Sequence, residues 1–369
     1  MSEINHHTIP ADIVCSDDYQ HYAESLLEKN RWDYIAGGSG DELTLNKNQQ
    51  AFNDLGLYQP LLPDIDALDT SVKLLDEYHQ YPMLLAPIAY QQLAHRDGEL
   101  ATVQAANAQD ISMILSTLSS VSLEQVSQYK TEQPLWFQLY IQGNKKHTDD
   151  LILRAENAGY KAIVITLDAP INGLRNREQR SQFVLPEGIS AKNLACYSHH
   201  DSKTLTTGLS NNRLSLSQLL SQAPRWQDIE LIIKKTKLPV YLKGILTPQD
   251  ALKAKNIGAA GIVVSNHGGR ILDGVCTSIQ ALPHIREAVG PDMVILLDSG
   301  IRRGSDIFKA LALGANSVLI GRPVIYALAT AGAMGVAHCL RLLKDEFELT
   351  MALTGCASIS DITVDKVRT

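Results

Sequence analysis

Eight short apolar runs recur between residues 83 and 320 and restrict what this chain can fold into. They are Met83–Ala86, Ile111–Leu115, Leu135–Tyr140, Ala162–Leu167, Val240–Lys243, Gly261–Val264, Val294–Leu297 and Ser317–Ile320. Runs of this length and composition predict buried strands. Segments of helical period lie between most of them, and parallel strands need such crossover helices. Eight strands alternating with helices predict an α/β fold, the (β/α)8 TIM barrel.

Three of the intervening helices carry clear boundary signals. Thr247-Pro248-Gln249-Asp250 predicts a capped helix start, and that helix stops near Gly258. Thr148-Asp149-Asp150 opens a helix that closes at Gly159, and Ser305-Asp306 opens one that ends at Gly314. An open doubly wound sheet is the alternative fold, and it predicts a glycine-rich turn after the first strand. Ala86-Pro87-Ile88-Ala89-Tyr90 has no such turn, which favours the barrel.

The barrel is expected to occupy residues 83–345 of a single domain, 1–369, with an extension at each end. In the N-terminal extension, 1–82, a helical pattern runs from Asp18 to Ala36 and a second short helix from Leu43 to Phe52, before short strands or loops at 61–81. A long polar insertion at about 176–224 follows the fourth strand. We interpret it as a mobile, lid-like cover over the barrel mouth, with an inert excursion as the alternative. Residues 346–369 form a C-terminal tail.

Charge and cysteine content exclude several classes of protein. Lys and Arg number 33 against 40 Asp and Glu, a net charge of −7 without a basic run, so we expect neither a nucleic-acid nor a membrane partner. The five cysteines lack metal-type spacing, and we expect no metal site. No secretory signal is visible at the N-terminus, and no apolar stretch reaches the roughly 18 residues that span a bilayer. These features predict a cytoplasmic protein.

Residues just beyond the strand ends carry the candidate chemistry, because active sites of such barrels lie at the C-terminal ends of the strands. The polar and loop residues at these ends are Pro87, Ile88, Ala89, Ser116, Gln138, Tyr140, Thr166, Asp168, Lys243, Ser265, His267, Arg270, Asp298, Ser299, Gly300, Arg302, Gly321 and Arg322. A single one of them would be unremarkable surface decoration. Their joint placement on one rim predicts an active site.

The last two strand ends predict a phosphate site. Backbone N–H groups at Gly300, Gly321 and Arg322, backed by Arg302, would bind a phosphorylated ligand. Ser116, Gln138 and Thr166 suit the edge of a flat heteroaromatic ring that has both donors and acceptors. Lys243 would place positive charge against a ring that becomes anionic on reduction. Flavin mononucleotide (FMN) fits both descriptions.

Motifs throughout the chain resemble those of the FMN-dependent L-2-hydroxy acid oxidase and dehydrogenase family, which includes glycolate, lactate and mandelate enzymes. They are Ser265-Asn266-His267-Gly268-Gly269-Arg270, Lys243-Gly244, Asp298-Ser299-Gly300-Ile301-Arg302-Arg303-Gly304, Ile320-Gly321-Arg322-Pro323, Phe137-Gln138-Leu139-Tyr140, Phe347-Glu348-Leu349-Thr350-Met351 and Tyr34 before Ala36-Gly37-Gly38. The resemblance runs from about Asp33 to Ile359. Ala36–Gly40, Ala86–Gln91 and Thr117–Ser122 are similar to the 4-hydroxymandelate oxidase branch.

The resemblance implies a role for each matching residue. His267 would be the base that takes a proton from the substrate, and Asp168 the carboxylate that orients it. Arg175 and Arg270 would hold the substrate carboxylate, with Tyr34 and Tyr140 adding hydroxyl groups. The remaining candidates would form the FMN shell: Pro87, Ile88, Ala89, Ser116, Gln138, Thr166, Lys243, Ser265, Asp298, Ser299, Gly300, Arg302, Gly321 and Arg322. Several relatives have a bulky aromatic residue at the position of Leu118.

The implied activity is FMN-dependent oxidation of an L-2-hydroxy acid, such as lactate, glycolate or a mandelate-like acid, to the 2-oxo acid. O2 would be the acceptor and give hydrogen peroxide, and the family suggests a homotetramer. A dehydrogenase of the same family linked to quinone or another acceptor is the first alternative, although its expected membrane segment is not matched by the polar insertion. A non-enzymatic flavin-binding or ligand-sensing barrel, and an FMN barrel acting on diphosphates, are further alternatives.

Overall fold

The computed structural model describes residues 8–129, 131–197, 217, 220–221 and 223–368. Eight parallel strands within them close into a barrel in the order β10-β11-β4-β5-β6-β7-β8-β9. The strands are β4 (Met83–Leu85), β5 (Ser112–Ser116), β6 (Leu135–Leu139), β7 (Ala162–Thr166), β8 (Val240–Ile245), β9 (Gly261–Val264), β10 (Val294–Leu297) and β11 (Ser317–Ile320). Each strand falls on the apolar run that predicted it, so the barrel fold is confirmed.

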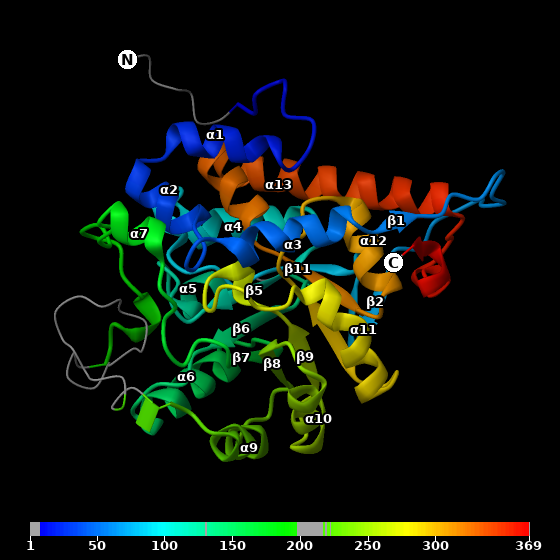
Figure 1. Cartoon of the computed structure of the whole chain (residues 1–369). Coiled ribbons are helices and arrows are strands. Elements are labelled where there is room, and N and C mark those ends of the chain that lie inside the picture. The colour runs from blue at the N-terminus through cyan, green and yellow to red at the C-terminus, as the bar shows by residue number, and fades with distance from the viewer. Residues whose placement is uncertain (1–7, 130, 198–216, 218–219, 222, 369) are drawn as a thin grey trace.

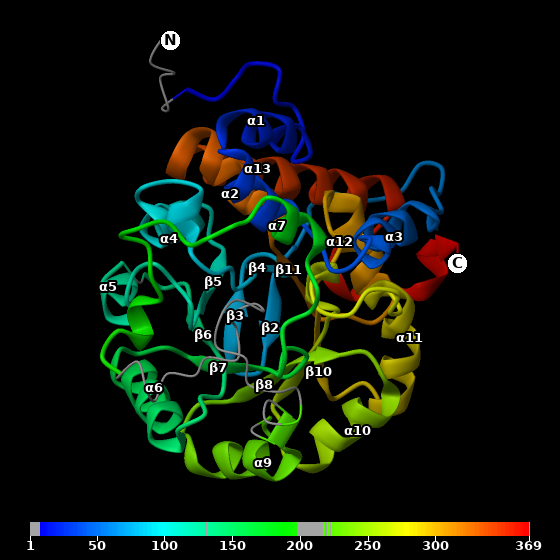
Figure 2. The same ribbon diagram turned by 60° about the vertical axis from the view of Figure 1, so that its left-hand side comes forward.

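Helices surround the barrel, as the end-on view in Figure 2 shows. They are α4 (Gly98–Ala108), α5 (Leu123–Ser127), α6 (Lys145–Asn157), α9 (Trp226–Lys235), α10 (Pro248–Asn256), α11 (Ser278–Val289), α12 (Gly304–Ala312) and α13 (Arg322–Thr354). The Thr247 side chain caps α10 as predicted. The predicted start of α6 at Thr148 was late, because the Asn144 side chain accepts the N–H of Lys146 and caps the helix one turn earlier.

Side chains along each strand point alternately into the barrel and toward the surrounding helices. Leu84, Ile114 and Trp136 pack together inside it, whereas Met83 and Met113 face the helices. Side chains two residues further along a strand point to the same side. At those positions polar groups replace the apolar ones: Ser116, Gln138, Thr166 and Lys243. The barrel interior is therefore apolar over most of its length and polar at the C-terminal ends of the strands.

The N-terminal extension lies over α13 and reaches the barrel mouth (Figure 1). It contains α1 (Asp18–Leu26), α2 (Lys29–Ala36) and α3 (Leu43–Asn53), so the predicted second helix is confirmed. The prediction of one helical segment from Asp18 to Ala36 was wrong. Leu27 and Glu28 have extended ψ angles of 143° and 140°, which break the helix where neither glycine nor proline marks an end.

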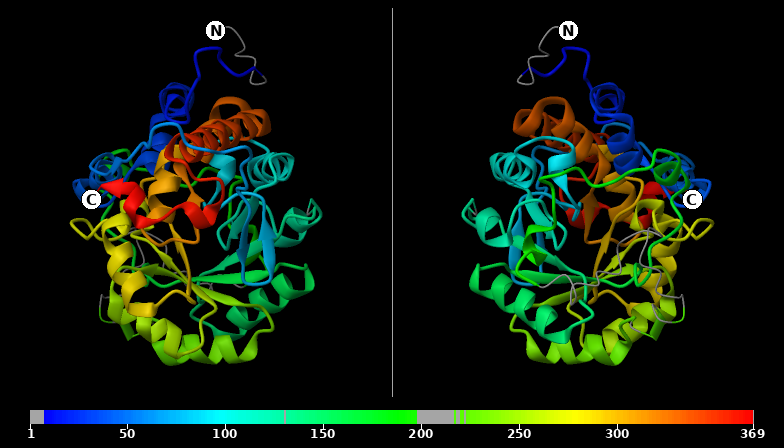
Figure 3. Two further views of the ribbon diagram at one scale, coloured as in Figure 1. Left: turned by 90° about the vertical axis from the view of Figure 1, so that its right-hand side faces the viewer. Right: turned by 90° about the vertical axis from the view of Figure 1, so that its left-hand side faces the viewer.

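Two small sheets complete the fold. The hairpin of β2 (Val72–Leu74) and β3 (Glu77–His79) lies against the barrel (Figure 3). Its Leu74 side chain belongs to the cluster of side chains inside the barrel. Strands β1 (Gly56–Leu57) and β12 (Val367–Arg368) pair in antiparallel fashion. The short 3-10 helices are η1 (Gln91–Leu93), η2 (Lys192–Leu194), η3 (His267–Gly269), η4 (Ile359–Asp361) and η5 (Val364–Lys366).

Helix α13 corrects the prediction that no segment is long and apolar enough to cross a bilayer. It contains an 18-residue window with a mean hydropathy of 1.5. However, 78% of that window is buried against the rest of the chain, and Ala331 and Gly332 leave the helical conformation within the helix. The apolar composition is explained by packing, since α13 contacts α1, α4 and α12.

The insertion after β7 begins with α7 (Asn176–Arg180) and includes η2. Much of its polar stretch, residues 198–216, lies outside the described residues, and so does that part of the predicted mobile cover. The described part of the insertion is nevertheless close to the barrel mouth, because Phe183, Val184 and Leu185 line the cavity there.

Candidate active site

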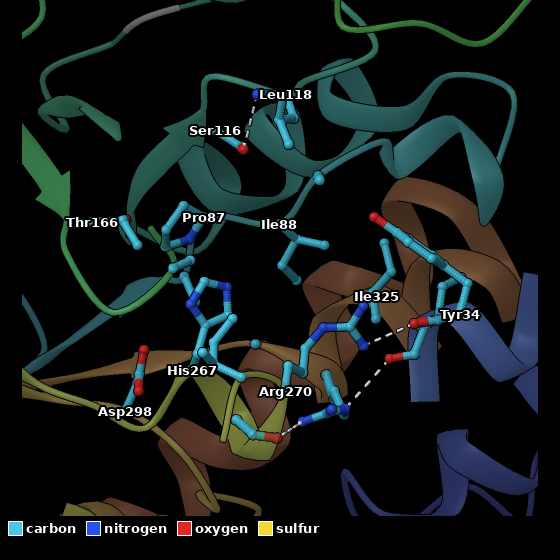
Figure 4. A pocket seen from close by; sticks show the side chains of 18 of the residues that line it. Tyr34, Pro87, Ile88, Ser116, Leu118, Thr166, His267, Arg270, Asp298 and Ile325 are labelled. Carbon is cyan, nitrogen blue, oxygen red and sulfur yellow. Dashed lines mark hydrogen bonds between the residues drawn. The ribbon is translucent and has the colours of Figure 1, made fainter. Parts of the chain in front are cut away.

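A cavity of about 460 Å³ opens at the C-terminal ends of the barrel strands. This volume lies within the range of small-molecule and cofactor sites. Figure 4 shows His267, Arg270, Tyr34 and Ile88 around it. The predicted site residues that line it are Tyr34, Pro87, Ile88, Ala89, Ser116, Gln138, Tyr140, Thr166, Arg175, Lys243, His267, Arg270, Asp298, Ser299, Gly300, Arg302, Gly321 and Arg322. The two others, Asp168 and Ser265, contact His267 and Lys243.

His267 and Asp168 form a hydrogen-bonded pair beside this cavity. The His267 Nδ1 atom lies 2.9 Å from Asp168 Oδ1. His267 has a φ of 58° and the next two glycines also have positive φ, a conformation that a non-glycine residue rarely adopts. The loop is held in it because the His267 N–H donates to Ser265 Oγ and the Gly268 N–H donates to Ser299 Oγ, each at 3.0 Å. Such strain at a pocket is typical of functional loops.

The charge state of this pair suits a base. Burial lowers the pKa of His267 below its ordinary value and outweighs the opposing charge of Asp168. Burial alone would raise the pKa of Asp168, but the charge of His267 and its hydrogen bond lower it overall. The imidazole is therefore neutral and the carboxylate ionised near pH 7. Asp168 Oδ2 is buried without a partner among the described residues.

The opposite side of the cavity is rich in guanidinium groups. Arg270 donates to the carbonyl oxygens of Tyr34 and Gly37, both at 2.8 Å, and lies over the Tyr34 ring. Burial, together with the charge of Arg175, lowers the pKa of Arg270 to about 9, so the group is still charged at neutral pH. Because carbonyl groups do not neutralise it, this buried cation favours an anionic ligand.

Arg175 and two aromatic side chains close this side of the cavity. Arg175 Nη1 lies 3.0 Å from Glu178 Oε2, and Arg175 Nε is buried without a partner among the described residues. Phe183 stacks on Tyr34, with ring centroids 4.5 Å apart. The segment that follows β7 therefore supplies both a positive charge, at Arg175, and an apolar cover, at Phe183. Glu178 and Phe183 were not predicted, although Phe183-Val184-Leu185 is an apolar triplet in a polar segment.

Lys243 and Gln138 form the floor of the cavity. The Lys243 ammonium lies 2.9 Å from Asp298 Oδ2 and donates to Ser265 Oγ at 2.8 Å. Burial would lower the pKa of Lys243, but the charge of Asp298 raises it overall and keeps the ammonium charged. Gln138 donates to Thr166 Oγ1 at 2.9 Å and accepts from the Thr117 N–H at 3.1 Å. The floor thus presents a fixed positive charge beside amide and hydroxyl groups.

Glycines and a helix end form the predicted phosphate site. A Cβ atom at Gly321 would meet only the Ala86 Cβ, at 3.8 Å, so a side chain there would occupy the cavity. Gly300 has a φ of 109°, and its Cβ would lie 2.4 Å from the Asn48 carbonyl oxygen, so this close approach requires glycine. Gly321 also precedes the N-terminus of α13, where backbone N–H groups favour an anion.

The residues present fit FMN. The glycine cradle and Arg322 would hold the phosphate, and Gln138, Thr166, Ser116 and Lys243 would contact the edge of the ring. Arg302, predicted to support the phosphate site, lines the cavity, and its side chain donates to the Ile301 carbonyl at 2.9 Å and lies 3.4 Å from Asp17. Arg322 also donates to carbonyl oxygens, those of Gly268 and Gly37, at 2.9 Å each.

The N-terminal extension supports the catalytic loop through a contact that sequence reasoning missed. Asn48 on α3 and Asn266 exchange two amide hydrogen bonds, of 2.9 and 2.7 Å, and both side chains are buried. Asn266 Oδ1 also accepts the Gly269 N–H at 3.0 Å. Asn48 lies in a segment whose only visible signal was helical, so its partner was not predictable from the pattern.

Comparisons with known proteins agree with this geometry. The family model described as FMN-dependent dehydrogenase matches residues 23–369. An L-lactate oxidase of Alicycliphilus denitrificans is 43% identical over 97% of each chain, and an L-lactate oxidase of Nostoc sp. is 44% identical over 94% of this chain and 95% of its own. The solved structure of mandelate oxidase with (S)-2-phenylpropionate superposes with a TM-score of 0.86 at 39% identity, over 96% of this chain and 98% of the other.

Proposed function

This chain belongs to the FMN-dependent dehydrogenase family, and from that premise we propose that it oxidises L-2-hydroxy acids to 2-oxo acids and passes the electrons to O2, giving hydrogen peroxide. The observation that carries the proposal is the neutral His267, paired with Asp168, on the same cavity as the buried cation Arg270. A proton acceptor beside an anion site suits a substrate with a hydroxyl group next to a carboxylate. Relatives named as L-lactate oxidase support the choice of O2.

Each side chain of the site has a separate role in the proposed reaction. Arg270 and Arg175 bind the substrate carboxylate, for which a planar guanidinium has the right geometry. His267 takes a proton from the substrate, and Asp168 stabilises the resulting imidazolium. FMN, when bound, would supply the acceptor for the two electrons and for the second hydrogen that leave the substrate. Lys243 places a fixed positive charge beside the predicted ring site, and the stacked pair Tyr34 and Phe183 limits access of water.

The pH dependence of kcat/KM should show an acid limb below pH 6.5. The reaction needs neutral His267, and burial places the pKa of that imidazole below its ordinary 6.5, so activity falls only when the pH drops through this lower value. Asp168→Asn removes a charge that raises the pKa of His267, so the residual activity of that variant should have its acid limb at still lower pH. Initial rates from pH 5 to 8 test this, and a half-maximal kcat/KM above pH 6.5 would contradict it.

Leu118 should determine how large a substrate the cavity accepts. This side chain is 6% exposed and lines the cavity, so tryptophan in its place would take up substrate space. We expect Leu118→Trp to lower kcat/KM for (S)-mandelate by about tenfold or more, the size of a steric mismatch in an apolar pocket. Glycolate, which has no side chain, is the internal control and should lose less than about threefold. An equal loss for both acids would remove Leu118 from substrate selection.

The electron acceptor distinguishes the oxidase from the alternative, a dehydrogenase linked to quinone or another acceptor. Turnover of L-lactate in air should release one hydrogen peroxide per 2-oxo acid formed. Turnover that requires an added quinone or dye, with no peroxide, would favour the dehydrogenase.

We also propose that the protein is a homotetramer and that it is located in the cytoplasm. The five cysteines support a reducing compartment, since all are free thiols, and sedimentation of the purified protein tests the tetramer.

A further inference from the structure

One amide from the long insertion lies behind the cavity wall and binds the loop that forms part of it. Asn193, in η2, has an exposed fraction of 0%. Its Oδ1 accepts the N–H of Leu123 at 2.7 Å. Its Nδ2 donates to the carbonyl oxygens of Ser116 and Thr117, at 3.2 Å each, and to Ser119 Oγ at 2.8 Å. The donor and the acceptor of this amide therefore both bind one segment, residues 116–123, which we call the β5–α5 loop.

That loop carries groups predicted to contact the flavin and the substrate. Ser116 and Leu118 line the cavity, and the Leu118 N–H donates to Ser116 Oγ at 3.1 Å (Figure 4). Thr117 donates to the Gln138 carbonyl at 2.6 Å, and its N–H donates to Gln138 Oε1 at 3.1 Å. The loop bound by Asn193 therefore also fixes the amide of Gln138, which in turn reaches Thr166 on the next strand.

The segment around Asn193 is itself anchored firmly. The Lys192 N–H donates to the Ser119 carbonyl at 3.0 Å, and Arg154 donates to the Asn193 carbonyl at 2.8 Å. Arg154 also pairs with Glu124 of α5 at 2.7 Å. Two helices on the outside of the barrel, α5 and α6, thus hold the insertion at this point. The backbone at Asn193 is therefore fixed relative to α5 and α6, and its side chain can hold the β5–α5 loop in one position.

We propose that Asn193 is a positioning residue: it sets the β5–α5 loop so that Ser116 and Gln138 present their side chains to FMN. This part of the insertion therefore supports the wall of the proposed cofactor site. The inference rests on the proposed function, because it assumes that this cavity holds FMN. Without the amide, the buried Leu123 N–H and the Thr117 carbonyl would lose the hydrogen bonds that Asn193 makes to them, and Ser116 and Ser119 would each lose one of two hydrogen bonds. Unpaired polar groups in a buried site are costly, so loss of the amide should shift the loop.

The test compares Asn193→Ala with Asn316→Ala. Asn316 accepts from the Ile295 N–H and from Arg286, each at 2.8 Å, and so fixes backbone close to where β10 and β11 begin, away from the cavity. Hydrogen exchange is measured on the FMN-free proteins. Asn193→Ala should raise exchange in residues 116–123 and leave 294–297 unchanged, whereas Asn316→Ala should do the reverse.

FMN binding to the same proteins is then measured by fluorescence titration. Asn193→Ala should raise the FMN dissociation constant by about tenfold or more and alter the visible spectrum of the bound flavin, and Asn316→Ala should do neither. If Asn193→Ala does not fold, Asn193→Asp, which keeps the acceptor for Leu123 but loses both donors, takes its place. Wild-type affinity and spectrum in the folded Asn193 variant would overturn the inference. Failure of the wild-type protein to bind FMN would instead overturn the proposed function.

Discussion

His267→Ala should slow the reduction of bound FMN by substrate by about 10²–10⁴-fold, the usual contribution of a positioned general base. The reason is geometric and electrostatic. The imidazole is neutral, is hydrogen-bonded to Asp168 at 2.9 Å and lies on the wall of the cavity that Arg270 also lines. Alanine removes the proton acceptor and leaves the glycine cradle and Lys243 in place. FMN should therefore still bind, and anaerobic stopped-flow absorbance at the flavin band measures the loss.

Two further variants distinguish the loss of the basic side chain at position 267 from a change in the conformation of its loop. His267→Gln keeps a polar side chain but is not basic, so it should lose as much as His267→Ala. Ser299→Ala removes the hydroxyl that accepts the Gly268 N–H and should lose far less if proton transfer is the essential role of the loop. FMN reduction in His267→Ala at nearly the wild-type rate would remove His267 from the mechanism.

Arg270→Lys should raise KM for an L-2-hydroxy acid by roughly ten- to a hundredfold, since hydrogen bonds to a charged group contribute about 1.5–3 kcal/mol. Lysine keeps the charge but not the planar fork that matches a carboxylate. It also removes the hydrogen bonds that Arg270 donates to the carbonyl oxygens of Tyr34 and Gly37. Steady-state kinetics with L-lactate and glycolate give the measurement.

An uncharged substrate provides the control for Arg270. The amide of the same 2-hydroxy acid lacks the carboxylate charge, so wild type and Arg270→Lys should differ much less on it. Arg31→Lys, at a partly exposed arginine of α2 that pairs with Glu28, should leave the kinetics of both substrates unaffected. An unchanged KM for L-lactate in Arg270→Lys would show that the carboxylate binds elsewhere.

The barrel and its ring of polar groups were predictable from two regular patterns. Short apolar strands alternate with helices along the chain, and side chains alternate in direction every second residue along each strand. Strand runs such as Gly261–Val264 are short and fully apolar, and they end in polar residues at a spacing of two from an inward-facing side chain. Val263 inside the barrel therefore implies that Ser265 points the same way. The strand ends of a parallel barrel converge on one face, so residues far apart in sequence could be placed together.

Contacts that depend on a partner from another element were not predictable. Asn193 and Asn48 look like ordinary polar residues until the loops that they bind are in place. The break after Leu26 was not predictable either, because no glycine or proline interrupts the pattern there. The burial of the apolar helix α13 was not predictable for the same reason, since it depends on packing against α1, α4 and α12.

The most direct test of the account is anaerobic mixing of the purified, FMN-loaded protein with an L-2-hydroxy acid while the flavin absorbance is recorded. The wild-type protein should bind FMN, turn yellow, and bleach on addition of L-lactate, glycolate or (S)-mandelate, with one 2-oxo acid formed per flavin reduced. Admission of air should restore the colour and release hydrogen peroxide. A protein that takes up no FMN, or whose bound FMN stays oxidised with all three acids, would contradict the assignment.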